Sequence, residues 1–245
     1  MNEKAKTITE EEIASVQEYS PEEDFNFQQL AVSEKGAYIK QRIIEFSKLM
    51  SYYKCAIMEI ETKLNVLNVE YSLSMDRNPI SSVKSRLKSL PSITEKLERR
   101  GLAQNIENIE KELNDIAGIR VICSFTDDVY LIADALLKQD DIVLIEKKDY
   151  IEKPKPNGYR SLHLIVSVPI FLAQEKRIMK VEIQLRTIAM DFWASLEHQL
   201  HYKKDFEFTD EMKRELYECA TMSAELDARM DALRNKALGN SDDRK

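Results

Sequence analysis

Strand-like segments alternate with helical ones between residues 82 and 202, and this alternation restricts the fold more than any other feature of the chain. Five segments carry the branched and apolar residues typical of strands, at 82–88, 119–125, 142–148, 159–168 and 177–186. Helical segments come at 92–100, 127–138 and 187–202, and the last is expected to bury Phe192, Trp193, Leu196 and Leu200. The order of elements predicts an α+β fold, with a mixed five-stranded sheet and helices packed on it.

Two long helical segments flank this region. In residues 34–72 apolar side chains recur at alternating steps of four and three, the spacing of a continuous seam on a helix, at Ile39, Ile43, Phe46, Met50, Tyr53, Ile57, Ile60, Leu64 and Leu67. The C-terminal segment repeats the spacing, at Met212, Leu216, Cys219, Ser223, Leu226, Met230, Leu233 and Ala237. The seams could pack on each other, on the central domain or across a subunit interface.

These patterns divide the chain into four expected segments. Residues 1–33 are acidic and low in periodic apolar residues, which indicates a mobile tail. A helical region at 34–75 precedes a central domain at 76–205, and a C-terminal helix follows at 206–245. No apolar run is long enough to span a bilayer and no secretory segment is visible, so a soluble cytoplasmic protein is expected.

Charge and cysteine usage exclude several classes of function. A net charge of −7 argues against broad, nonspecific nucleic-acid binding. Positive charge is local, in residues 84–96 and 147–160, which suits a small polyanion or an ordinary solvated face. Three widely spaced cysteines without CxxC spacing are expected to be buried and unbonded, and the histidines show no HExxH or HxH pattern for a transition metal.

The run from Lys153 to His163 gathers cations around a turn. Two prolines and the pair Asn157-Gly158 favour the turn, because proline fixes φ and Asn-Gly tolerates positive φ. Tyr159 offers a flat face for a base, and the cations beside it suit phosphates. The loop is therefore expected to close over a nucleotide, although a solvated hairpin would have the same composition.

Two carboxylates lie beside or within predicted strands. Asp115 comes just before the segment 119–125, and a carboxylate at the mouth of a sheet is a natural magnesium ligand. Strand alternation places Glu182, Gln184 and Arg186 on one face and apolar residues on the other. A Glu182 carboxylate beside Asp115 would complete a two-carboxylate metal site.

Four cations stand near these acids in the expected fold. Arg86 and Lys88 share a strand face and Lys96 follows on the next helix, which is compatible with a clamp for a triphosphate. Arg120 interrupts an apolar strand, and a buried guanidinium needs a partner, either a carboxylate or a nucleotide.

Four motifs follow in a fixed order within about residues 75–205. They are Arg86-Leu87-Lys88 with Ser92-Ile93 and Lys96, then residues 115–120, 155–163 and 181–187. Together they resemble the synthetase domain of the (p)ppGpp synthetases, the alarmone enzymes of the stringent response. The short length and flanking helices are similar to the small, single-domain members, without the hydrolase domain and its His-Asp motif.

The resemblance implies a nucleotidyltransferase-like fold and a GTP pyrophosphokinase. Such an enzyme moves the β,γ-pyrophosphate of ATP onto the ribose 3′-hydroxyl of GDP or GTP and releases AMP. Small members often form symmetric oligomers, so a homo-oligomer is expected, with a tetramer favoured, and some members bind an alarmone effector at an interface.

Residue roles follow from the same resemblance. It implies that Arg86 and Arg120 sandwich adenine, that Lys88 and Lys96 hold the ATP phosphates, and that Asp115 binds Mg²⁺. Glu182 would be a metal partner or the base for the 3′-hydroxyl. For the GDP or GTP site it implies stacking by Tyr159 and phosphate contacts by Lys155 and His163, with Asn157, Gln184 and Arg186 in support.

Two other functions are compatible with the same residues. A catalytically inactive module could sense nucleotides or touch single-stranded RNA through the basic loop. A nucleotidyltransferase would move a nucleotidyl group and release pyrophosphate in place of AMP.

Overall fold

The structure is a computed structural model that describes residues 34–75, 77–202 and 209–242. The expected acidic tail, residues 1–33, lies outside the described residues. The chain divides into two compact units, one made of Met1–Tyr52 and Ser89–Leu113 and the other of Tyr53–Lys88 and Asn114–Lys245. Of the helices described, none combines the length and apolar character that a membrane crossing requires.

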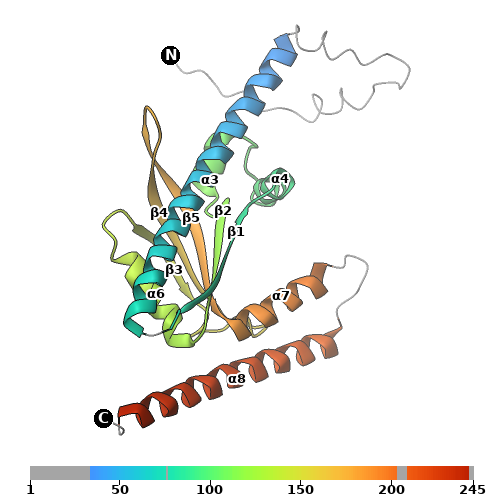
Figure 1. Cartoon of the computed structure of the whole chain (residues 1–245). Helices are drawn as coiled ribbons and strands as arrows, with labels where there is room; N and C mark the ends of the chain where they lie inside the picture. Colours follow the sequence, from blue (N-terminus) through green and yellow to red (C-terminus); the bar gives the residue numbers. More distant parts are fainter. Residues whose placement is uncertain (1–33, 76, 203–208, 243–245) are drawn as a thin grey trace, which may run out of the picture. The chain divides into compact units, whose positions relative to one another are not determined.

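The larger unit is built on a five-stranded sheet. Its strands are β1 (Ile80–Leu87), β2 (Ala117–Cys123), β3 (Val143–Asp149), β4 (Leu162–Phe171) and β5 (Lys176–Thr187). They are ordered β1-β2-β5-β4-β3, with β5 in the middle (Figure 1). The pair β2–β5 is parallel and the other pairs are antiparallel, which confirms the predicted mixed sheet.

The strand registers give the sheet one polar face. One row of paired residues crosses all five strands, at Lys84, Arg120, Gln184, His163 and Lys148. The adjacent row holds Arg86, Gly118, Glu182, Ile165 and Glu146. Paired residues share a face, and so do residues two apart along a strand, so both rows lie on the same side of the sheet.

The opposite face of the sheet is apolar and covered by helices. Val181, Ile183 and Leu185 of β5 are fully buried there, as the alternation predicts. Helix α6 (Thr126–Leu137) packs on β2 and β5 and buries its own apolar stripe. The second half of α3 (Glu34–Met75) buries Ile60 and Leu64, and its Lys63 Nζ bonds both Asp141 oxygens, at 2.7 and 2.8 Å, just after α6.

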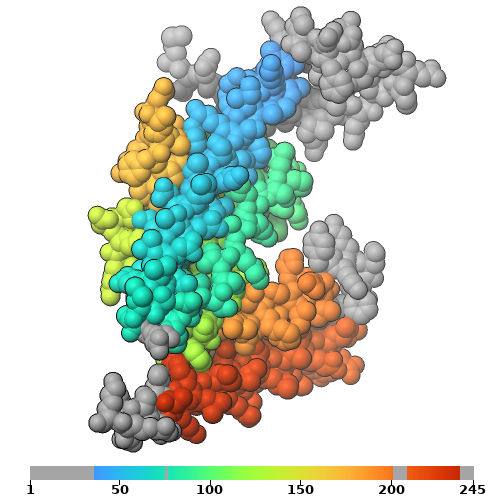
Figure 2. All heavy atoms as spheres, viewed as in Figure 1, coloured from blue at the N-terminus to red at the C-terminus, as the bar shows by residue number. Residues whose placement is uncertain are grey.

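Two antiparallel helices follow the middle strand. Helices α7 (Ile188–Tyr202) and α8 (Asp210–Asp242) lie side by side, and Figure 2 shows them as one continuous surface. Trp193 Nε1 donates to the Leu216 carbonyl at 3.0 Å, and Ser223 Oγ donates to the Ala189 carbonyl at 3.0 Å. These bonds fix α8 on α7, beside the end of β5.

Among its described residues, the smaller unit contains two short helices besides the first half of α3. Helix α4 (Leu90–Arg99) starts after Ser89, with Pro91 inside its first turn, and ends before Gly101, which has φ 66°. Helix α5 (Ile106–Glu112) is capped by the Asn105 side chain, which accepts from the Asn108 N–H at 2.8 Å. Both helices bury apolar residues, at Ile93, Leu97 and Ile109.

One prediction about packing was wrong, and the two predicted seams are only partly covered within the single chain. In α7 only Trp193 of the four expected core residues is buried, whereas Phe192, Leu196 and Leu200 are 66%, 43% and 47% exposed. In α8 the predicted seam is only partly covered: Leu226, Met230 and Leu233 lie open, whereas Leu216 packs beside Trp193 and Ser223 donates to the Ala189 carbonyl on α7. The α3 seam is likewise open in its first half, at Ile39 and Ile43. An apolar stripe marks an amphipathic helix but does not say which side meets a neighbour within one chain.

The starting point of β4 and the environment of one cysteine also differ from expectation. Strand β4 begins at Leu162, not at residue 159, because the Lys155 N–H donates to the Tyr159 carbonyl at 3.1 Å and so keeps Tyr159 in the loop. Cys123 is buried, but Cys55 is half-buried and Cys219 is exposed on α8.

Candidate active site

Glu182 occupies the centre of the polar face, on the middle strand. Its Oε2 accepts a hydrogen bond from Gln184 Nε2 at 3.1 Å, and its Oε1 lies 3.7 Å from His163 Nδ1. Burial raises the pKa of Glu182, but the hydrogen bond and charge of His163 and the amide of Gln184 outweigh burial, so the pKa lies below its usual value. Glu182 is therefore an ionised, largely buried carboxylate at neutral pH.

Asp115 stands two residues before β2, at the mouth of the strand beside Glu182. Its Oδ2 accepts a hydrogen bond from Lys88 Nζ at 2.8 Å. Lys88 is held at the end of β1, where its N–H donates to the Ile116 carbonyl at 2.8 Å. The Asp115 charge raises the pKa of Glu182, so the two carboxylates interact across the sheet although 67 positions separate them in sequence, from 115 to 182.

A cluster of cations surrounds one carboxylate on the same face. Asp191, in the first turn of α7, has its Oδ1 3.2 Å from Arg186 Nη1 and 3.3 Å from Arg120 Nη1. Its Oδ2 lies 3.6 Å from Lys84 Nζ. Burial lowers the pKa of Arg120, and the charges of Arg186 and Arg86 lower it further, whereas Asp191 raises it. The charge excess makes this region suited to an anionic ligand.

Tyr159 lies in the loop before β4, with its hydroxyl directed at the polar face. The hydroxyl is 2.8 Å from His163 Nε2 and accepts a hydrogen bond from Arg186 Nη2 at 2.7 Å. Lys155 Nζ lies 4.7 Å from the centroid of the Tyr159 ring and 4.7 Å from that of Tyr150. The ring is thus held in place by the sheet while its neighbours include a cation suited to phosphate.

A tight turn presents Tyr159, as the sequence predicts. The Gly158 N–H donates to the Lys155 carbonyl at 2.8 Å, with Pro156 and Asn157 at the central positions. The Asn157 side chain accepts from the Tyr159 N–H at 3.2 Å and donates to Glu197 Oε1 on α7 at 3.3 Å. Asn157 therefore serves the turn and its attachment to α7.

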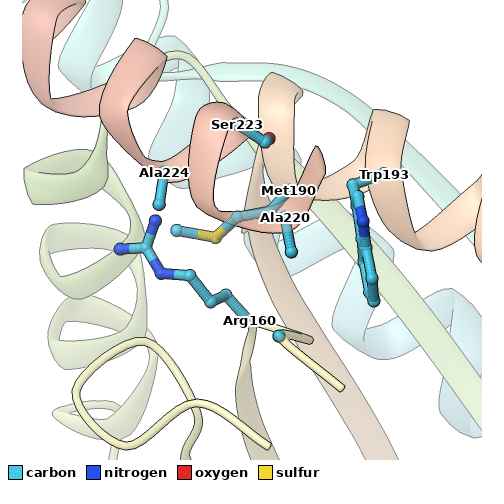
Figure 3. A pocket seen from close by; sticks show the side chains of 7 residues that line it. Arg160, Met190, Trp193, Ala220, Ser223 and Ala224 are labelled. Carbon is cyan, nitrogen blue, oxygen red and sulfur yellow. The ribbon is translucent and has the colours of Figure 1, made fainter. Parts of the chain in front are cut away.

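Helix α8 packs against the turn at Gly158. Gly158 has φ 87° and faces Ala220, so closely that a side chain at position 158 would collide with the Ala220 methyl. A small hollow beside this contact is lined by Arg160, Met190, Trp193, Ala220, Ser223 and Ala224. In Figure 3 the Arg160 side chain runs past Met190 towards Ala224. The nucleotide loop proposed from sequence is therefore braced by the C-terminal helix.

The structure brings most of the predicted site residues to one face of the larger unit. These are Arg86, Lys88, Asp115, Arg120, Lys155, Asn157, Tyr159, His163, Glu182, Gln184 and Arg186. Lys96 lies on α4, in the smaller unit, so its contribution to a phosphate clamp stays a prediction. For Arg120 the sequence left a carboxylate or a nucleotide as partner, and the structure supplies the carboxylate of Asp191.

Two residues of this face escaped prediction. Tyr150 packs edge-on against His163, with ring centroids 5.2 Å apart, and follows Glu146 and Lys148 in an alternation that could have revealed it. Asp191 carried no such signal, because an acidic residue in the first turn of a helix is explained by the helix dipole alone.

Comparison with known proteins agrees with this arrangement. A family model described as "Region found in RelA / SpoT proteins" matches residues 85–207. The chain belongs to the RelA/SpoT family. It is 44% identical over 178 residues to GTP pyrophosphokinase YwaC of Bacillus subtilis (strain 168), across 73% of this chain and 85% of that protein.

Solved structures of small family members have the same fold. Small alarmone synthetase 1 from Bacillus subtilis bound to its product pppGpp matches with a TM-score of 0.72 and 33% identity, over 78% of this chain and 97% of that chain. The same protein bound to AMPCPP matches with a TM-score of 0.68 and 31% identity, over 80% and 98%. This RelA/SpoT protein is therefore of the small alarmone synthetase type, with the mixed α+β fold predicted from its sequence.

Proposed function

We propose that the protein is a GTP pyrophosphokinase, which transfers the β,γ-pyrophosphate of ATP to the 3′-hydroxyl of GDP or GTP, makes ppGpp or pppGpp and releases AMP. The observation that carries this proposal is the meeting of Asp115, Glu182, the arginine pair Arg86 and Arg120, and the Tyr159 loop on one face of the sheet. The relative solved with pppGpp carries that compound as its product, and the AMPCPP complex is the same protein with an ATP analogue.

The donor side of the proposed site lies along β1 and β2. Arg86 pairs with Gly118, and Arg120 pairs with Lys84, so the two arginines lie on neighbouring strands of the same face. Planar guanidinium groups in this arrangement suit stacking on both sides of adenine. Lys88 would hold the ATP phosphates, and the same role for Lys96, on α4, stays a prediction from the sequence.

The acceptor side is the loop before β4. Tyr159 would stack on guanine, since its ring is fixed through its hydroxyl and base stacking needs a rigid platform. Lys155 and His163 stand beside that ring and would contact the phosphates of GDP or GTP. Asn157 and Gln184 would hold the loop and the Glu182 carboxylate, respectively.

The carboxylates of Asp115 and Glu182 fit a magnesium ion that is shared with the substrate phosphates. Among the described residues there is no group of three or more His, Cys, Asp or Glu side chains that could form a complete metal cage. Mg²⁺ is ordinarily bound through one or two carboxylates together with phosphates and water, so Asp115 and Glu182 suffice. The ion would neutralise charge on the pyrophosphoryl group during transfer. The pKa of Glu182 lies below its usual value, so the carboxylate is ionised and would serve either as a metal partner or as the base for the 3′-hydroxyl.

In this proposal Lys88 exchanges Asp115 for the ATP phosphates when ATP binds. Its ammonium now neutralises Asp115 at 2.8 Å, and incoming triphosphate would draw it away and leave the carboxylate to the metal. Positioning and neutralisation are what pyrophosphoryl transfer chiefly requires, and these residues supply both.

Product analysis tests the proposal directly. Incubation with ATP, Mg²⁺ and GDP or GTP, followed by anion-exchange chromatography, should yield AMP and a 3′-pyrophosphorylated guanosine nucleotide. Release of pyrophosphate in place of AMP would indicate a nucleotidyltransferase, and tight nucleotide binding without product would indicate an inactive sensing module. The variants Asp115→Ala and Glu182→Ala should fold by circular dichroism and make no product, so near-normal turnover in either would refute the metal site.

Assembly and further ligands form part of the same proposal. An exposed apolar stripe on α7 supports a homo-oligomer; it consists of Ile188, Phe192, Leu196 and Leu200. The resemblance to the small family members favours a tetramer. Phe192→Glu should lower the mass measured by light scattering.

We also propose an alarmone effector at a subunit interface, single-stranded RNA as a ligand of the basic loop, and a cytoplasmic site of action. Residues 76–205 would be the catalytic domain. Equilibrium binding and cell fractionation test these points.

A further inference from the structure

Asp191 joins the two halves of the proposed site through a single carboxylate oxygen. Its Oδ1 lies 3.3 Å from Arg120, on the donor side, and 3.2 Å from Arg186 Nη1. The other terminal nitrogen of Arg186, Nη2, donates to the Tyr159 hydroxyl at 2.7 Å, on the acceptor side. One ion pair and two hydrogen bonds thus connect Arg120 to Tyr159 through Asp191 and Arg186.

Burial makes this series of contacts sensitive to the loss of any one of its side chains. The Arg186 side chain is 5% exposed and that of Asp191 is 13% exposed, so their interaction is only weakly screened by water. The Arg120 side chain, at 37% exposed, is the more open end of the series, so a ligand can reach it. Arg120 and Arg186 repel each other, and Asp191 offsets that repulsion.

We propose that Asp191 is a positioning residue that couples the ATP site to the guanosine-nucleotide site. The inference rests on the proposed function, because it takes Arg120 as an adenine contact and Tyr159 as a guanine contact. Stacking of adenine on Arg120 fixes the guanidinium against Asp191, which in turn fixes Arg186 and the Tyr159 ring. The second nucleotide then binds to a site that is already arranged, so each substrate tightens the binding of the other.

Calorimetry on the full chain measures the coupling without turnover. The dissociation constant of GDP is determined with Mg²⁺, alone and with saturating AMPCPP, and the ratio of the two values is the coupling factor. For the wild-type protein we expect a factor of about five or more, the lower end of typical coupling between sites. Asp191→Asn keeps the shape but removes the charge, and the factor should fall to about one.

A matched control separates coupling from general loss of charge. Lys84 Nζ also faces Asp191, at 3.6 Å, but its side chain is 62% exposed and leads to neither Arg186 nor Tyr159. Lys84→Ala should therefore retain the wild-type factor. Tyr159→Phe breaks the series of contacts at its other end, because it keeps the ring and removes the hydroxyl, and it should lower the factor as Asp191→Asn does. This variant also serves if Asp191→Asn does not fold.

Two outcomes would overturn the inference. The first is a wild-type factor of one, and the second is a factor retained when Asp191 is neutral. In the second case, a loss of discrimination between GDP and IDP in Asp191→Asn would mean that Asp191 contacts the base directly. Product formation decides the proposed function separately: product without coupling refutes only the role of Asp191, and absence of product refutes the synthetase assignment whatever the factor.

Discussion

Replacing Gly158 with alanine adds one methyl group at a backbone position with φ 87°. A left-handed conformation costs an L-residue about 1–2 kcal/mol. The methyl would also collide with the Ala220 side chain and lie 3.4 Å from Tyr217 Cδ2, and such overpacking costs about 1–3 kcal/mol. The two costs together predict a loss of about 2–5 kcal/mol, unless the loop swings away from α8.

Two companion variants divide that loss into its parts. Gly101 also has a positive φ, 66°, but an added Cβ there meets nothing within 4 Å, so Gly101→Ala should lose only the conformational part, about 1–2 kcal/mol. Ala220→Gly removes the methyl that Gly158→Ala would strike. The double variant should therefore be less destabilised than the sum of the single variants by about 1–3 kcal/mol.

Urea unfolding followed by circular dichroism measures these free energies. Steady-state product formation with GDP varied reports whether the loop moved, because Tyr159 is the next residue and its displacement would raise the KM for GDP. Equal losses for Gly158→Ala and Gly101→Ala, or strict additivity of Gly158→Ala with Ala220→Gly, would refute the close packing of the loop on α8.

Three further predictions follow from individual contacts. Tyr159→Ala should raise the KM for GDP by about 5- to 150-fold, the equivalent of 1–3 kcal/mol of stacking, while the KM for ATP changes much less in the same assays; equal losses would contradict the stacking role. Arg77→Ala should cost about 3–5 kcal/mol in urea unfolding, because both hydrogen bonds from Arg77 to the 2%-exposed Asp128 side chain are lost, and a loss under 1 kcal/mol would contradict it. Burial raises the pKa of Asp227, so the native state binds that proton more tightly than the unfolded chain and gains stability as pH falls. Asp227→Asn should therefore have the higher Tm at pH 7, and the difference should shrink as pH falls towards 3.8, the ordinary Asp value; a widening difference would show the opposite sign.

Much of the fold could be predicted because local rules and tertiary packing agree there. The alternation along β5 identifies its buried face, and every strand of the sheet lies within a few residues of its predicted position. The prediction failed where tertiary packing decides which side of a helix is buried. The apolar stripe of α7 predicts an amphipathic helix correctly, but Phe192 and Leu196 are exposed in the single chain.

The candidate site divides in the same way. Residues in contiguous motifs, such as the turn from Lys155 to Tyr159, could be proposed from sequence because proline and Asn-Gly impose local geometry. Asp191 could not, since its role depends on Arg120 and Arg186, which reach it only when β2 and β5 pair in parallel.

The sequence alone determined which segments become strands and helices, where the chain turns before Tyr159, and which family the motifs resemble. Backbone propensity and side-chain periodicity act over a few residues, so they can be recognised from the amino-acid sequence alone. Only the tertiary structure decided that Lys88 neutralises Asp115, that α8 braces Gly158, and that one oxygen of Asp191 serves two arginines. Those contacts depend on distances of a few ångströms between segments remote in sequence, and such distances exist only after the sheet has formed and its helices have packed.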